Sequence, residues 1–296
     1  MKKVFLFLFV SFLVLGLAYS ENYLNEKNNN FLWKVKSAEH EVYILGSIHL
    51  GKKEFYPLDV KIEESFEKSD VLVVEVNLND IDPAITQNMV FEKGFYPVGE
   101  TLKDHLSSKT YQLVAEKFQK LGLDVEFFSD SKPWYIAMNI MTMELMRLGY
   151  NPEYGIDKYY LEKAKNNKKI LGLETFEFQL GLFDSFSEKQ QELFLLSTLA
   201  EVDLISHEMD KMLYFWKNGD AEKMELMLSK PLKVYPEIKN IYDKLIFDRN
   251  EKMANKIDGF LKDDAIYFIV VGAAHLVGDK GIISILEKKG YSVTQL

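Results

Sequence analysis

Two nearly continuous runs of apolar, largely β-branched residues constrain the fold of this chain most: VLVVEVN (71–77) and AIYFIVVG (265–272). Apolar runs without polar alternation are typical of strands buried on both faces of an α/β sheet. Two further strands, FLWKVKS (31–37) and EVYILGS (41–47), are joined by a short turn and read as a hairpin. The sheet must therefore be assembled from the two ends of the chain.

The middle of the chain is mostly helical. Pro133 can open an apolar helix that ends at Gly149, because proline suits the first helical turn and glycine the position after the last. A short strand, KKILGLET (168–175), lies inside this middle part. We expect an α/β fold: a mixed central sheet from N- and C-terminal strands, with a large helical insertion at about residues 79–258. No linker rich in Pro, Gly or Ser divides residues 31–296, which we expect to form a single domain.

The N-terminal segment 1–20, MKKVFLFLFVSFLVLGLAYS, has two lysines, an apolar stretch and small residues near its end. This pattern predicts a secretory signal. The alternative is an uncleaved membrane anchor, because the apolar stretch is long for a signal and short for a span. Residues 21–30 form a polar tether. We expect an exported protein, periplasmic or extracellular, with no other segment apolar enough to cross a bilayer.

Charge and cysteine content exclude several functions. The chain of 296 residues has a formal net charge of −9, which argues against nucleic acid or an anionic membrane surface as a partner. It has no cysteine, so disulfides, a thiolate nucleophile and Cys-ligated metals are excluded. Any metal would be bound by His, Asp or Glu. Those ligands suit Mn²⁺, Co²⁺, Zn²⁺ and Fe²⁺ alike.

The phrase G-x-x-H-L occurs twice, in YILGSIHLG (43–51) and in FIVVGAAHL (268–276), each time where a predicted strand ends. The glycines lack a side chain, so the backbone can turn sharply and neighbouring groups can approach. In open α/β sheets, ligands gather at the carboxyl ends of the strands. We therefore predict that His49 and His275 lie at one site, with imidazoles within about 5–7 Å, close enough to share one metal ion.

Two glutamates and an arginine complete the candidate site. Glu75 lies within the strand 71–77, where a charge is costly unless it is paired or metal-bound, and Glu174 ends the strand 168–175. The alternatives are solvent-facing or strand-end charges. Arg249, one of two arginines, is predicted to clamp a carboxylate or to stabilise an oxyanion, a surface charge being the alternative. The sequence has no G-x-S-x-G, H-E-x-x-H, Walker or G-x-G-x-x-G motif.

These segments together resemble the TraB/GumN family, which includes the Tiki ectodomain proteases. The resemblance runs through LWKV…VYILGSIHLG, PLDVKIEESFEKSDVLVVEVN, YGIDKYYLEKAKNNKKILGLETFEFQL, DRNEKMANKI and FIVVGAAHLVGDKGIISILEKKGYSVTQL. One departure is Ser47, where the family's first motif often has Thr. The resemblance implies a fold related to the erythromycin-esterase-like and haem-uptake ChaN-like proteins, and Mn²⁺ or Co²⁺ as cofactor. It maps the family's site onto His49, Glu75 and His275, with Glu174 and Arg249 as further members.

The leading hypothesis is an exported metal-dependent hydrolase, a peptidase by resemblance, acting on a peptide or small-molecule substrate. His49 and His275 would bind the ion, and Glu75 would be a third ligand or the general base. Arg249 would stabilise the oxyanion. Two alternatives stay open: a non-catalytic binding protein that sequesters a peptide or haem, and a metal-free hydrolase with His49 as base. The residues leave the substrate, the ion and the oligomeric state undefined.

Overall fold

A computed structural model describes residues 29–296 of the chain. Its centre is a six-stranded mixed sheet with the strand order β4-β3-β5-β2-β1-β6. The strands are β1 (Leu32–Lys36), β2 (Glu41–Ser47), β3 (Val71–Val74), β4 (Lys169–Gly172), β5 (Tyr267–Gly272) and β6 (Ser292–Gln295). The predicted mixed α/β sheet is confirmed, and its strands come from the two ends of the chain except for β4, which comes from the middle.

Strand direction decides where the site residues lie. β2 and β3 both pair parallel to β5, and β3 pairs parallel to β4, while β1 is antiparallel to β2 and β6. The register of β2 and β5 sets Ser47 opposite Gly272. The two G-x-x-H loops therefore leave neighbouring strands at the same edge of the sheet, the carboxyl edge of its four parallel strands.

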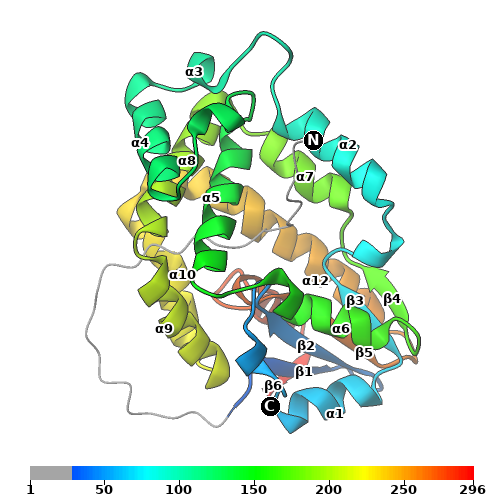
Figure 1. Ribbon diagram of the computed structural model, residues 1–296. Helices are drawn as coiled ribbons and strands as arrows, with labels where there is room; N and C mark the ends of the chain where they lie inside the picture. Colours follow the sequence, from blue (N-terminus) through cyan, green and yellow to red (C-terminus); the bar gives the residue numbers. More distant parts are fainter. Residues whose placement is uncertain (1–28) are drawn as a thin grey trace.

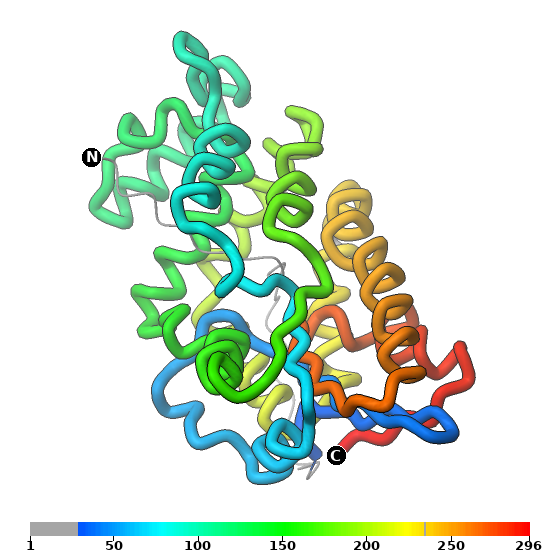
Figure 2. Tube along the Cα trace, turned by 90° about the vertical axis from the view of Figure 1, so that its right-hand side faces the viewer, coloured from blue at the N-terminus to red at the C-terminus, as the bar shows by residue number. Residues whose placement is uncertain are grey.

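Helices surround this sheet and form a lobe beside it, which contains most of the chain between β3 and β5 (Figures 1 and 2). The helices are α1 (Val60–Lys68), α2 (Pro83–Gly94), α3 (Leu102–His105), α4 (Ser108–Lys120), α5 (Pro133–Arg147), α6 (Ile156–Ala164), α7 (Phe176–Asp184), α8 (Glu188–Val202), α9 (Ile205–Lys217), α10 (Ala221–Val234), α11 (Lys239–Tyr242), α12 (Asp248–Phe260) and α13 (Ile282–Lys288). The predicted insertion at about 79–258 is thus helical except for β4, which returns to the sheet beside β3.

One continuous set of buried apolar residues joins the sheet to the helical lobe. The predicted signal segment, residues 1–20, and most of the tether lie outside the described residues. Within residues 29–296, no helix is long and apolar enough to cross a membrane.

Candidate active site at the carboxyl edge of the sheet

Four predicted site residues follow the four parallel strands. His49 lies two residues after β2, His275 three after β5, Glu75 one after β3 and Glu174 two after β4. Because the carboxyl ends of parallel strands meet at one edge, the fold brings these side chains together, and α12 adds Arg249. The sequence had placed Glu75 inside its strand, but β3 ends at Val74.

Arg249 is fully buried and joins the two glutamates. Its Nη2 atom donates to Glu75 Oε2 at 2.6 Å and to Glu174 Oε2 at 2.8 Å. Its Nη1 atom donates to the carbonyl oxygen of Leu245 at 2.8 Å, and its Nε atom donates to Glu174. The guanidinium group thus binds two carboxylates, which agrees with the prediction that Arg249 clamps a carboxylate. Its proposed contact with an oxyanion stays a prediction.

Glu75 is buried, with 5 % of its surface exposed, and both of its carboxylate oxygens have donors. Oε1 accepts the Gly272 N–H at 2.7 Å, and Oε2 accepts from Arg249 and, at 3.1 Å, from Gln179 Nε2. Burial alone would raise the pKa of Glu75, but Arg249, the two site histidines and the Gly272 N–H lower it to about 2. A solvent-facing Glu75 is therefore excluded, and the side chain is a fixed, ionised carboxylate.

His275 lies fully buried in the short 3-10 helix η7 (Ala273–His275). Its Nδ1 atom is 2.6 Å from Asn250 Oδ1, and Asn250 is itself held by donating to the carbonyl oxygen of Lys280. Since an amide oxygen only accepts, Nδ1 carries the proton and Nε2 keeps its lone pair. Nε2 faces Glu75 Oε1 at 3.7 Å. Burial and Arg249 lower the pKa of His275 to about 3, so its imidazole is neutral.

His49 is in a different environment. Its side chain is 16 % exposed, and its Nδ1 atom lies 2.7 Å from Asp157 Oδ2. The Ser47 hydroxyl donates to the other oxygen of Asp157 at 2.8 Å. Burial alone would lower the pKa of His49, but Asp157 and Glu75 raise it to about 9 against an opposing effect of Arg249. His49 is thus an imidazolium ion at neutral pH in the metal-free protein.

Asp157, Asn250 and Gln179 were not found by sequence reasoning. Asp157 reaches His49 because the first residue of α6 is hydrogen-bonded to the first G-x-x-H loop: the Ile156 N–H donates to the carbonyl oxygen of Ile48 at 3.1 Å. A Cβ at Gly155 would lie 2.2 Å from the carbonyl oxygen of His49, so this approach requires glycine. Gly155 in YGID allows this close approach, but it does not mark Asp157 as the partner of a histidine.

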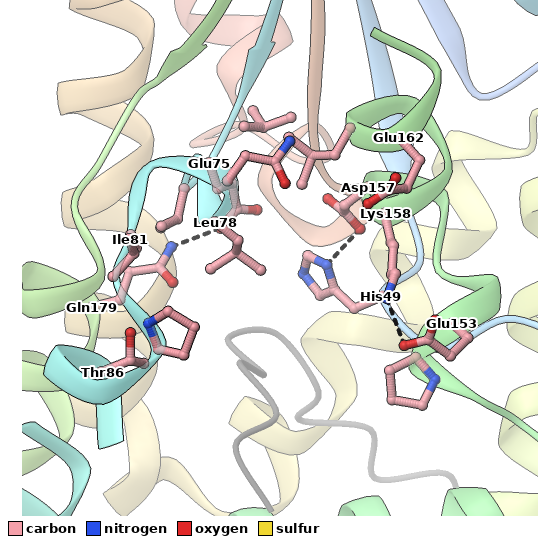
Figure 3. A pocket seen from close by; sticks show the side chains of 16 residues that line it. His49, Glu75, Leu78, Ile81, Thr86, Glu153, Asp157, Lys158, Glu162 and Gln179 are labelled. Carbon is pink, nitrogen blue, oxygen red and sulfur yellow. Dashed lines mark hydrogen bonds and ion pairs between the residues drawn. The ribbon is translucent and has the colours of Figure 1, made fainter. Parts of the chain in front are cut away.

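A cavity of about 370 Å³ opens at this edge of the sheet. His49 and Glu75 approach it from two sides, and Gln179 lies beside Glu75 (Figure 3). His275, Arg249 and Glu174 are not among its lining residues. The cluster therefore has an accessible half, with His49 and Glu75, and a buried half that holds Glu75 in place.

The donors present fit a divalent metal ion in part. Both imidazoles have an outer partner at Nδ1, an arrangement typical of metal-binding histidines. Glu75, however, has both oxygens engaged. Within residues 29–296, no group of three or more His, Asp or Glu side chains is arranged to hold an ion. The His/His/Glu ligand set therefore remains a prediction.

Comparison with known proteins identifies the family. The profile of the TraB/PrgY/gumN family matches residues 31–295, so the chain belongs to this family. It is 24% identical to the uncharacterized protein YbaP of Escherichia coli (strain K12), over 88% of this chain and 95% of YbaP.

The chain is also similar to proteins named metalloproteases. It is 20% identical to metalloprotease TIKI1 of Danio rerio and 22% identical to metalloprotease TIKI2 of Xenopus tropicalis, over 90% of this chain in both alignments. These alignments cover 63% and 60% of the two relatives, so the chain matches less than two thirds of their length. No solved structure matches the chain significantly.

Proposed function

We propose that this chain is an exported, metal-dependent hydrolase of peptides whose reaction takes place at the carboxyl edge of the sheet. One observation supports it most: an ionised Glu75 and a carboxylate-oriented His49 line one accessible cavity, and a neutral His275 lies buried beside Glu75. Perturbed titratable groups gathered at a cavity are typical of catalytic sites. The peptide substrate and the metal are proposed from the similarity to the TIKI metalloproteases. Export is proposed from the sequence of the N-terminal segment.

Each residue has a distinct part in this proposal. The Nε2 atoms of His49 and His275 would hold the ion, since Asp157 and Asn250 occupy the two Nδ1 atoms. A divalent ion supplies Lewis-acid chemistry: it polarises a carbonyl and makes water more acidic. Glu75, with a pKa of about 2, is a weak base, so its contribution is a fixed negative charge that orients water beside the cavity. Arg249 and Glu174 hold that charge in place.

The pair of His49 and Asp157 favours a second candidate, a metal-free hydrolase. A carboxylate that orients an imidazole is the usual companion of a histidine base. In this reading the neutral form of His49, which predominates only above its pKa of about 9, takes the proton of the attacking water, so cleavage should increase with pH up to that value. We also propose that the fold is related to the erythromycin-esterase-like and ChaN-like folds. This relation is compatible with both candidate functions.

Metal content and peptide cleavage, measured on the same protein, test the proposal. The full-length protein is expected to bind one equivalent of divalent metal, to cleave a peptide library as seen by mass spectrometry, and to lose cleavage with EDTA. His49→Ala and His275→Ala should each abolish bound metal, whereas His207→Ala, an exposed histidine on α9, should retain it.

Other outcomes separate the alternatives. Unchanged stoichiometric metal in both site variants would refute the two-histidine site. Cleavage that resists EDTA would select the metal-free hydrolase. A peptide or haem that is bound and recovered intact would select sequestration.

A further inference from the structure

The cavity beside His49 and Glu75 has two walls from distant parts of the chain. One runs from the end of β3 into α2 (residues 74–86), and the other is the 3-10 helix η4 (Pro152–Tyr154) with most of α6 (residues 152–162) (Figure 3). We propose that these walls select a peptide with an apolar side chain next to the bond that is cut and a lysine or arginine within two residues of it. This inference rests on the proposed function, because it names the substrate class of that site.

The apolar selection comes from side chains of both walls. Val76, Leu78 and Ile81 line one wall, and Leu161 lines the other. Leu78 is 45% exposed, so a ligand in the cavity can cover apolar surface that water now contacts. A mainly apolar lining with a few convergent polar groups is the usual composition of a small-ligand cavity. An apolar substrate side chain fits this lining, whereas a charged one would lose its hydration there.

The size of the cavity limits what enters it. Its volume of about 370 Å³ lies near the lower end of small-ligand cavities, which range from about 300 to 1,000 Å³. That space holds a short stretch of an extended chain. A flexible segment or a free peptide therefore suits the site, and a folded surface does not.

The charges of the lining select for a cation. Four carboxylates and two cationic side chains line the cavity. Three of the carboxylates are already bound: Glu75 by Arg249, Asp157 by His49, and Glu153 by Lys158 at 2.6 Å. The fourth belongs to Glu162, which is exposed on α6 one turn after Lys158.

Glu162 is the group that a substrate cation would meet. Among the described residues, none forms an ion pair with its carboxylate. An ammonium or guanidinium group that enters along α6 would supply the counter-charge, and an acidic peptide would be repelled. The net charge of −9 adds a negative potential around the cavity, which also favours a cation over an anion.

Quenched fluorescent peptides in one common frame test this selection on the full-length protein. The position before the cleaved bond is Leu or Ala, and a position within two residues of it is Lys or Glu. We expect kcat/KM to be about tenfold higher for Leu than for Ala, because extra apolar surface is buried. We expect about a fivefold preference for Lys over Glu, the size of an exposed ion pair at low salt.

Two variants and their matched controls locate the selection. Glu162→Lys should reverse the charge preference, whereas Glu116→Lys, the same change of charge at an exposed site on α4, should leave it unchanged. Leu78→Gln should reduce the preference for Leu over Ala, whereas Leu226→Gln, at another exposed leucine on α10, should not.

Binding of the same peptides, measured by anisotropy, keeps this inference distinct from the proposed function. Cleavage without either preference, or a Glu162→Lys variant that keeps the wild-type preference, would overturn the inference and leave the hydrolase in place. Selective binding without cleavage would support the inference and refute the hydrolase. If the protein neither cleaves the peptides nor binds them selectively, both fail.

Discussion

The loops after β2 and β5 carry the same G-x-x-H-L phrase in opposite electrostatic surroundings. His49 faces a carboxylate, Asp157, and lies on a cavity wall, which raises the pKa of its imidazole to about 9. His275 faces a neutral amide, Asn250, and is fully buried beside Arg249, which lowers its pKa to about 3. The phrase sets where each histidine leaves the sheet. The surroundings set its charge: Asp157 of α6 for His49, and burial beside Arg249 of α12 for His275.

This difference gives the two histidines different tasks. A neutral, fully buried imidazole is a fixed part of the site. The charged imidazole at the cavity wall is the part that can exchange a proton or meet a ligand. Four changes, taken from the largest expected effect on stability to the smallest, can break or sharpen this comparison.

Arg249→Leu should have the largest effect, because Arg249 lies against both halves of the site. Removing it leaves Glu75 and Glu174 buried without a counter-charge, at a cost of about 3–5 kcal/mol in the free energy of unfolding. Urea denaturation of the variant measures this. Arg249→Lys keeps the positive charge but not the planar guanidinium group, so its free energy of unfolding should fall by less than that of Arg249→Leu. A Leu variant as stable as the wild type would contradict the assigned role.

His275→Ala and His49→Ala should differ in stability. Losing His275 leaves a cavity in the core and the amide oxygen of Asn250 without its donor, at about 2–4 kcal/mol. Losing the partly exposed His49 should cost about 1 kcal/mol in the metal-free protein near pH 8. Urea denaturation in the presence of EDTA measures the free energy of unfolding of both variants. A larger loss for His49→Ala than for His275→Ala would contradict the assigned environments.

The ion pair of His49 and Asp157 should make stability depend on pH. The folded pKa of His49, about 9, lies above its unfolded value of 6.5, so the pair stabilises the fold fully below pH 6.5 and loses that effect as pH rises through 9. In EDTA, the wild type should exceed His49→Gln by about 2 kcal/mol at pH 6, after allowance for partial exposure. The difference should vanish by pH 10. A pH-independent difference would exclude the charged pair.

Ser47→Ala should have the smallest effect, about 1 kcal/mol, because it removes one hydrogen bond to Asp157. Ser47→Thr keeps the hydroxyl and should recover most of that loss. Thermal denaturation of the two variants measures the difference. Equal stability of the Ala and Thr variants would show that the hydroxyl does not hold Asp157.

Local patterns predicted the strands and the edge of the sheet. A strand that is buried on both faces has a continuous apolar sequence, as at 71–77 and 265–272. The glycine of each G-x-x-H phrase indicates where its strand ends. The charge of Glu75 in an apolar run indicated a partner, and Arg249 was among the candidates. These inferences needed only the neighbouring residues.

The histidine partners could not be predicted in the same way. Asp157 lies 108 residues from His49, and nothing in YGID distinguishes it from a solvated aspartate in the first turn of a helix. Asn250 lies 25 residues from His275. Such pairings depend on how helices pack on the sheet, and that packing decides the charge of each imidazole.

The central claim is that the two G-x-x-H loops form one catalytic unit. It is tested most directly by kcat/KM of His49→Ala, His275→Ala and the double variant, on a peptide that the wild type cleaves. Groups that act as a unit are strongly non-additive. Each single variant should therefore lose about 10³-fold in kcat/KM, and the double variant should lose no more than either single one. Losses that multiply in the double variant, or a single variant with wild-type activity, would contradict the claim.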